Sequence, residues 1–130
     1  MTGMTDLDAM LRSLTVSIRR EQYTFVTVAS PPPLGDGIAA LLTEAEGATV
    51  VATVERATAE GWTYDFEAAW LTLEIHSALE AVGLTAAFSA VLADAQIPCN
   101  VLAGFHHDHL LVPADRATEA VAALESLRPE

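Results

Sequence analysis

The sequence predicts an α+β fold in which two similar units each pack helices on one face of an antiparallel sheet. Apolar and polar residues alternate in several short segments, whereas in other segments apolar residues recur at helical spacing. Of the 130 residues, 52% are apolar, which is enough for a substantial core in a chain of this length. Strand and helix signals also succeed one another in a related order in both halves, which suggests two copies of one unit.

The N-terminal segment is predicted to form a short helix followed by two strands. A short helix is predicted over Thr5–Leu14, and a strand is predicted at Val16–Ile18, where apolar residues alternate with polar ones. We interpret Arg19–Gln22 as a polar turn before a second strand, Tyr23–Val28, which is rich in β-branched and aromatic residues. Three prolines, Pro31–Pro33, end that strand because proline cannot donate to a ladder.

The rest of the first half has weaker signals. Within Gly35–Gly47 we expect a short helix at Ile38–Leu42. Thr49–Val54 is predicted to be a strand, because it is nearly continuous in β-branched residues. A short helix follows over Glu55–Glu60, and Gly61 is expected to stop it.

The second half alternates more clearly. In the first predicted strand, Leu71, Leu73 and Ile75 share one face, and Trp70, Thr72 and Glu74 share the other. The expected elements are a strand at Trp70–Ile75, a helix at Leu84–Ala95, strands at Cys99–Phe105 and His109–Pro113 around a polar turn at His106–Asp108, and a last helix that is capped by Asp115 and carries Ala117, Val121, Leu124 and Leu127.

This order lacks only a final strand of the ferredoxin-like βαββαβ unit. We therefore predict tandem ferredoxin-like units, an N-terminal half over residues 1–65 and a C-terminal domain over residues 66–130. The surplus segment 1–18 is expected to supply the strand that completes the C-terminal sheet.

Charge and composition exclude several functions. A formal charge of -12 argues against nucleic-acid binding, which needs a basic patch, and the absence of lysine excludes Schiff-base chemistry. Cys99 is the single cysteine, so no intramolecular disulfide can form. No apolar window is long enough for a membrane span, and the acidic start does not resemble a signal peptide, so we expect a cytoplasmic protein.

Two runs, Trp70–Ala87 and Ile97–Pro113, resemble the ACT domain, and Leu41–Gly47 resembles it more loosely. The chain is similar to small stand-alone bacterial proteins with two ACT-like halves, which are related to the ACT repeats of eukaryotic cytosolic arginine sensors. The resemblance implies a regulatory module that binds a small effector, usually an amino acid, between paired domains. It also implies a homodimer and no catalysis.

The expected start of the helix at Gly83, Leu84 and Thr85 is one candidate site. Unpaired N–H groups and the helix dipole favour a carboxylate there, with Ser77 in reach on the preceding loop. The alternative is structural: Gly83 permits a tight turn, and Thr85 caps the helix. The resemblance favours use by a ligand, because ACT effectors commonly sit at this connection.

The run His106–His109 allows three interpretations. It can be a solvated hairpin tip, a zinc site, or a ligand contact in which Asp108 pairs with an ammonium group and an imidazole forms a hydrogen bond. In extended backbone His107 and His109 share one side, and no partner with zinc-ligand spacing lies nearby in the sequence. The resemblance supports the ligand interpretation.

Two further residues have open roles. Asn100, expected to be buried, either braces the backbone or contacts a ligand. His76 is either a satisfied edge residue or a ligand contact, and a triad with the adjacent Ser77 lacks the required strand-to-helix turn. The ligand-binding prediction thus comprises His76, Ser77, Gly83, Leu84, Thr85, Asn100, His107, Asp108 and His109.

The leading hypothesis is a non-enzymatic module that needs no cofactor or metal. With few bases available for an acidic side chain, the effector is expected to be a neutral or basic amino acid. Any output passes to an unidentified partner protein or through assembly. Two alternatives stay open: a small metal-dependent enzyme that uses His106–His109, and a structural or assembly protein with an empty site.

Overall fold

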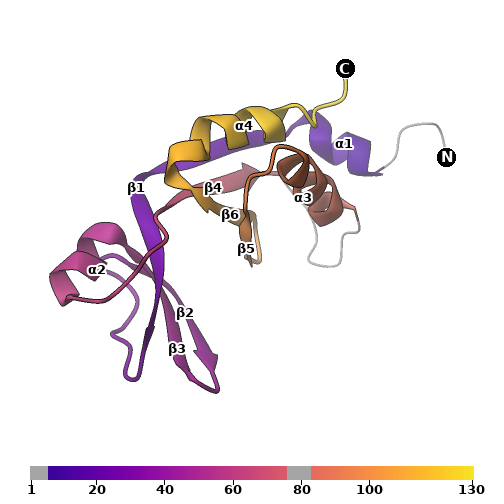
Figure 1. Cartoon of the computed structure of the whole chain (residues 1–130). Coiled ribbons are helices and arrows are strands. Elements are labelled where there is room, and N and C mark those ends of the chain that lie inside the picture. Colours follow the sequence, from indigo (N-terminus) through magenta and orange to yellow (C-terminus); the bar gives the residue numbers. More distant parts are fainter. Residues whose placement is uncertain (1–5, 76–82) are drawn as a thin grey trace.

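The structure is a computed structural model that describes residues 6–75 and 83–130 (Figure 1). Its elements are α1 (Asp6–Arg12), β1 (Thr15–Val28), β2 (Ile38–Glu44), β3 (Gly47–Thr53), α2 (Val54–Glu60), β4 (Ala68–Glu74), α3 (Leu84–Asp94), β5 (Asn100–Ala103), β6 (Asp108–Pro113), a 3-10 turn (Ala114–Arg116) and α4 (Ala117–Glu125). No helix in the described ranges has the length and apolar character needed to cross a bilayer.

In the described part of the chain, six strands form one antiparallel sheet in the order β2-β3-β1-β4-β6-β5. The long strand β1 joins the two halves. Its first part pairs with β4, with Val16 opposite Leu73 and Ile18 opposite Leu71, and its second part pairs with β3. The N-terminal strand therefore lies in the same sheet as the strands of the second half. A domain division at residues 65 and 66 stays a prediction.

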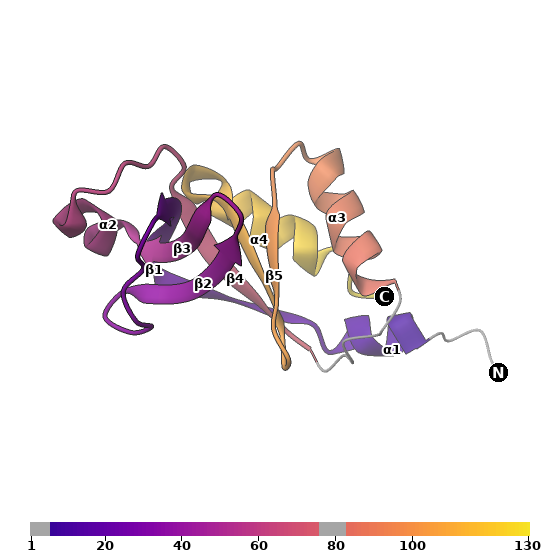
Figure 2. The same ribbon diagram turned by 90° about the horizontal axis from the view of Figure 1, so that it is seen from below.

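The helices pack on one face of this sheet. The helices α1, α3 and α4 lie beside the C-terminal part of the sheet (Figure 2). The main core lies between these helices and the sheet, and it includes fully buried residues such as Leu71, Phe88 and Leu110. At the other end, α2 packs on β1 and β3 over Val50 and Ala52. The predicted α+β class, with helices on one side of an antiparallel sheet, is confirmed.

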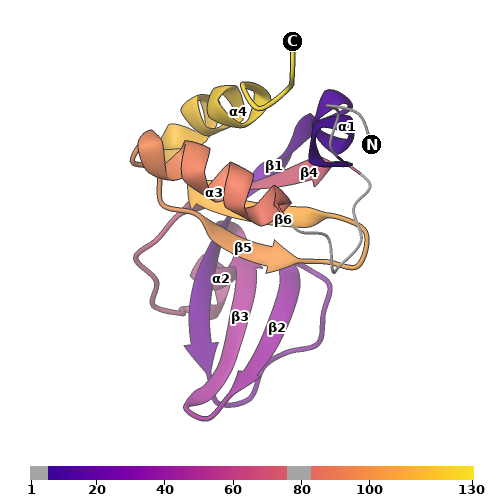
Figure 3. The same cartoon turned by 90° about the vertical axis from the view of Figure 1, so that its right-hand side faces the viewer.

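The opposite face of the sheet is concave. Its apolar cluster draws side chains from all six strands, and Trp70 at its centre is 3% exposed although no helix covers it. The strands of the C-terminal half cross those of the N-terminal half at a steep angle in Figure 3, so the sheet wraps around its own apolar residues. This cluster comprises Tyr23, Val51, Ala68, Trp70 and Leu111, with Phe25, Ala39, Ala40, Phe66 and Leu102 packed against it.

The polar turn predicted at Arg19–Gln22 is wrong. β1 is continuous, and between the pairs Ile18–Leu71 and Gln22–Ala69 three residues of β1 face the single residue Trp70. This is a β-bulge, which accommodates extra polar residues by bending the strand rather than by reversing it. The bend lets β1 pass from one half of the sheet to the other.

Two other local predictions are wrong. Ile38–Leu42 is part of strand β2 and not a helix, because it pairs with β3 across a hairpin at Glu44–Gly47. A helix of so few residues is marginal in water, whereas pairing satisfies the backbone of the whole segment. Asp115 does not cap α4: it lies in the 3-10 turn, and neither that turn nor α4 has a side-chain cap.

Candidate functional site

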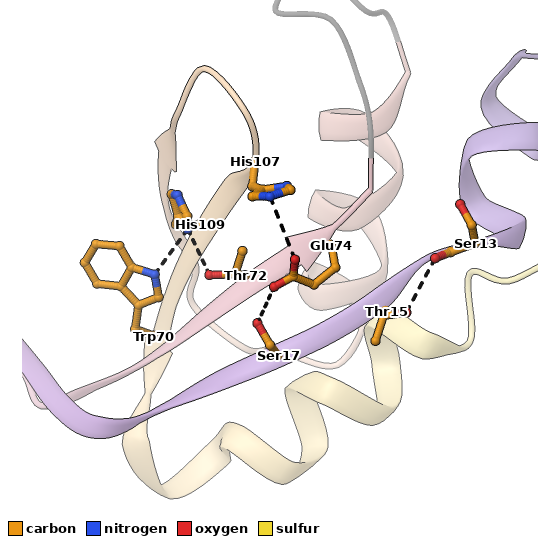
Figure 4. A network of polar contacts seen from close by, with 8 residues as sticks. All are labelled: Ser13, Thr15, Ser17, Trp70, Thr72, Glu74, His107 and His109. Atoms are coloured by element: carbon orange, nitrogen blue, oxygen red, sulfur yellow. Dashed lines mark hydrogen bonds and ion pairs between the residues drawn. The ribbon is translucent and has the colours of Figure 1, made fainter.

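Polar side chains gather on the concave face where β1, β4 and β6 lie side by side (Figure 4). The register places Ser17 opposite Thr72 and Thr72 opposite His109, so the three side chains form a row across the strands. Because side chains alternate along a strand, Trp70 and Glu74 lie on the same face as Thr72. We call Ser17, Arg19, Trp70, Thr72, Glu74, His107 and His109 the concave-face site.

His109 is held as a neutral imidazole. Its Nδ1 lies 3.2 Å from Trp70 Nε1 and 2.9 Å from Thr72 Oγ1. Indole N–H only donates, so Nδ1 accepts, and the ring proton resides on Nε2. Burial, followed by the charge of Arg19 and the electrostatic effect of His107, lowers the pKa of His109 below its ordinary value of 6.5, against the opposing effect of Asp108 and Glu74.

Glu74 connects β1 to the β5–β6 hairpin. Ser17 Oγ donates to Glu74 Oε2 at 2.8 Å, and His107 Nε2 lies 3.8 Å from Glu74 Oε1. The other ring nitrogen of His107, Nδ1, is buried and has no hydrogen-bond partner among the described residues. A buried polar atom without a partner is costly in a folded protein, so this imidazole is available to a ligand or a bound water.

Arg19 is the cation of the site. Its guanidinium carbon lies 3.8 Å from the centroid of the Trp70 ring, and its Nη1 donates to the Tyr23 hydroxyl at 3.1 Å. Tyr23 and Trp70 are themselves in ring contact, with centroids 5.0 Å apart. Stacking on an aromatic face stabilises a guanidinium by about 0.5–2 kcal/mol and keeps its N–H groups in one plane. The bulge of β1 aims this side chain at the tryptophan.

The structure brings some of the predicted ligand residues together. His107 and His109 both reach the concave face, near Glu74 and Thr72 respectively (Figure 4). Asp108, half-buried, lies between them as the first residue of β6. His106 is exposed in the turn, where its ring contacts Phe105.

The predicted site at the start of α3 lies on the other side of the sheet. Gly83 is the N-cap of α3 with φ +102°, no side chain caps the helix, and its first turn carries no acid. Leu84 is buried in the core beneath the helices, whereas Thr85 is exposed. The side chain of Leu7 packs against Gly83, because its Cδ2 would lie 3.3 Å from a Cβ there.

The remaining predicted site residues and the metal-site interpretation have the following outcomes. The expectation that Asn100 is buried is wrong, because it is exposed on β5, an outer strand of the sheet. His76 and Ser77 lie outside the described residues. Among the residues that the structure does describe, no group of three His, Cys, Asp or Glu side chains is placed to hold a metal ion.

Sequence reasoning missed Ser17, Arg19, Trp70, Thr72 and Glu74 as site residues. The alternation of β4 had already placed Thr72 and Glu74 on one face with Trp70, so two polar residues beside a tryptophan were the available signal. Arg19 had no such signal, because its position depends on a bulge.

The neutral state of His109 predicts a pH effect on stability. An unfolded histidine binds its proton near pH 6.5, whereas His109 in the folded protein resists protonation until the pH is lower. The unfolded state therefore binds more protons in this window, and the free energy of unfolding falls as the pH drops below 6.5. Replacing His109 with Gln should remove this part of the slope in urea unfolding on both sides of that pH. Replacing the exposed His106 with Gln should leave it unchanged, and equal slopes for the two variants would contradict the assignment.

Two sequence families and several solved structures are similar to this chain. Residues 2–69 match one ACT domain family, and residues 65–126 match a second. A Vibrio cholerae protein of unknown function, described as a possible transport protein, is 36% identical, and the match covers 98% of this chain and 100% of that one with a TM-score of 0.85. No curated protein matches the sequence.

More distant structures share the fold. An Agrobacterium tumefaciens protein is 17% identical over 87% of each chain with a TM-score of 0.69. The ligand-free regulatory subunit of aspartate kinase from Thermus thermophilus is 10% identical, over 88% of this chain and 96% of that one, with a TM-score of 0.65. At these identities the similarity concerns the fold alone.

Proposed function

The chain belongs to the ACT domain family, and from this premise we propose that it is a non-catalytic regulatory module whose effector is an amino acid. The ACT matches together span nearly the whole chain. A regulatory subunit of aspartate kinase shares the fold, which is compatible with a regulatory role. The effector is a neutral or basic amino acid, since the chain has few bases for an acidic side chain.

One observation carries the proposal: the concave-face site combines opposite charges, hydrogen-bonding groups and an aromatic ring without a helix over it. Arg19 supplies a cation, Glu74 supplies an acid, and His107 has a ring nitrogen without a hydrogen-bond partner among the described residues. Binding sites for small molecules combine an apolar lining with a few placed polar groups in this way. In our proposal the ammonium of the effector pairs with Asp108 or with backbone carbonyls.

The chemistry of the described side chains favours binding over catalysis. Burial raises the pKa of Cys99 to about 11, so this thiol is protonated at neutral pH and is a poor nucleophile. The hydroxyl of Ser17 bonds to a carboxylate rather than to an imidazole. His109 has its accepting nitrogen occupied by Trp70 and Thr72, so it is not positioned as a general base.

The output of such a module depends on another molecule. An effector with different affinities for two assemblies shifts the equilibrium between them, and a partner protein detects the change. We propose a cytoplasmic homodimer that acts in this way, and a relationship to the eukaryotic arginine sensors stays a prediction. The first turn of α3, at Gly83, Leu84 and Thr85, is a second candidate seat for the effector's carboxylate.

The test is binding of each of the common amino acids to the purified chain, measured by thermal shift and then by calorimetry. A specific effector at about 100 times its Kd adds about 2.7 kcal/mol to stability. His109→Gln should weaken binding by about two- to tenfold, since it removes one hydrogen-bonding group. His106→Gln, an identical change at the exposed turn, should have no effect.

Three results would contradict the proposal. The first is a lack of response to every amino acid, which would favour a structural protein with an empty site. The second is a response to a divalent metal that EDTA abolishes, which would favour the metal-dependent alternative. The third is turnover of a bound amino acid.

A further inference from the structure

A small hollow opens beside Arg19. It has a volume of about 190 Å³ and is lined by Arg19, Tyr23, Gly37, Ile38 and Ala39. At about 30 Å³ for each water in the liquid, it has room for about six water-sized groups, enough for a carboxylate and the atoms next to it. One wall comes from β1, and the other comes from the start of β2.

Both walls of the hollow are irregular at the same place. β1 bulges at residues 19–21, opposite Trp70, and β2 bulges at Ala39, which has no partner between the pairs Ile38–Ala52 and Ala40–Val51. Bulges often occur next to functional sites, where they re-aim side chains or interrupt pairing. Here the two bulges face each other across a space with a guanidinium at its rim.

The guanidinium in this hollow has no anionic partner in the part of the chain that the structure describes. In the described ranges, the ion pairs of arginine involve Arg56, Arg116 and Arg128, and none involves Arg19. The chain carries 18 acids, so the lack of an ion pair between Arg19 and a described carboxylate is not due to a shortage of acids. One of its donors is bonded to Tyr23, and the Trp70 ring covers one face. The Arg19 side chain is itself exposed, so an incoming anion can reach its donors.

We infer that Arg19 binds the carboxylate of the effector in this hollow, so that the carboxylate seat is on the concave face and not at the first turn of α3. The inference rests on the proposed function for the identity of the ligand. A guanidinium that is already oriented by two aromatic side chains binds a carboxylate with little loss of conformational freedom. The start of α3 offers backbone N–H groups, but Leu7 packs against its N-cap and Leu84 is buried.

The hollow also limits the size and charge of the group that enters. Its other lining residues, Tyr23, Gly37, Ile38 and Ala39, carry no charge, so Arg19 is the only ionised group in the lining. A singly charged carboxylate is neutralised there, whereas a second negative charge has no described cation among the lining residues. The site is therefore suited to a compact monocarboxylate.

The inference is tested with tryptophan fluorescence. The chain has two tryptophans, so Trp62→Phe leaves Trp70, on which Arg19 stacks, as the single reporter. In this background, propionate and each amino acid that binds the unmodified chain are titrated, alongside the carboxamide of that amino acid. We expect saturable binding of the acids and at least about tenfold weaker binding of the carboxamide, which lacks the charge.

Variants then locate the carboxylate. Arg19→Gln should weaken binding at least about tenfold, and Arg19→Lys should give an intermediate loss because it keeps the charge but not the planar fork. Arg20→Gln is the matched control, since it removes the same charge from the next residue of the same bulge, and it should bind as the unmodified chain does. Thr85→Asp tests the other candidate seat, because a negative charge in the first turn of α3 weakens binding only if the carboxylate lies there. Circular dichroism shows whether each variant is folded.

The outcomes separate the two proposals. Amino-acid binding that Thr85→Asp abolishes and Arg19→Gln does not would overturn the inference and leave the proposed function standing. Propionate binding that depends on Arg19, without binding of any amino acid, would support the carboxylate seat and overturn the proposed function. Equal effects of Arg19→Gln and Arg20→Gln would show attraction by net charge only and would overturn the seat. Binding of neither acid would overturn both.

Discussion

Replacing Trp70 with alanine is expected to lower the free energy of unfolding by about 3–5 kcal/mol, the range found for large aromatic residues in cores. Trp70 is 3% exposed and lies at the centre of the concave-face cluster, to which every strand contributes. Its loss leaves a cavity that the sheet can close only by changing its curvature. The change also removes the indole donor to His109 and the ring beneath Arg19, so ligand binding should be lost with stability.

Urea unfolding followed by circular dichroism measures this effect. Trp62→Ala is the matched control. Trp62 is half-buried at the margin of a different apolar cluster, which contains Val50 and Ala52, so its replacement should lower the free energy of unfolding by less. Trp70→Phe keeps a ring beneath Arg19 but removes the hydrogen bond, so it should cost less than Trp70→Ala. If the alanine variants of the two tryptophans unfold at the same urea concentration, Trp70 is not the centre of a core.

The parts of the fold that could be predicted are those in which local pattern and packing agree. In β4 the alternation of Leu71 and Leu73 with Trp70 and Thr72 was sufficient, since one set faces the helices and the other faces the concave side. The C-terminal end of α2 was also predictable, because Gly61 adopts a left-handed conformation after the last turn. Such features depend on neighbours in sequence.

The incorrect predictions concern segments whose structure depends on distant strands. Arg19–Gln22 has the composition of a turn, but it is held extended because the parts of β1 on either side of it pair with β4 and β3, which lie far away in sequence. Ile38–Leu42 has no strong periodicity, and only pairing with β3 makes it a strand. In both places the register shifts, and a register cannot be inferred from one segment alone.

In the candidate site, too, some positions follow from local sequence pattern and others depend on the pairing of distant strands. The neighbouring positions of His107 and His109 followed from alternation along an extended segment. That they meet Glu74 and Thr72 depends on the pairing of β4 with β6 and on the β5–β6 turn. Arg19 could not be predicted, because a bulge in one strand and a ring on another place it. Residues that bind ligands are often placed by such irregular backbone, which carries no periodic signal.

The second large effect is expected at Gly37, which lines the hollow beside Arg19. Its φ is +88°, and a Cβ there would lie 2.8 Å from Thr53 Oγ1 and 2.9 Å from Arg56 Cβ. The backbone cannot simply move away, because Gly37 O accepts the hydrogen bond of Thr53 N at 2.8 Å. Thr53 is also constrained, since its hydroxyl caps α2 by accepting from Arg56 N. An alanine therefore forces either the cap or the loop to shift.

Gly37→Ala should lower the free energy of unfolding by about 2–5 kcal/mol, the sum of about 1–2 for a left-handed conformation and about 1–3 for overpacking. Gly35→Ala is the matched control: its φ is +105°, but no atom lies within 4 Å of the added Cβ, so only the backbone strain applies. Urea unfolding should rank Gly37→Ala well below Gly35→Ala in stability. Titration at a temperature where both are folded should show weaker carboxylate binding for Gly37→Ala alone, because only that change displaces a wall of the hollow. Equal losses of stability for the two variants would mean that the contact between this loop and the start of α2 does not hold the hollow in shape.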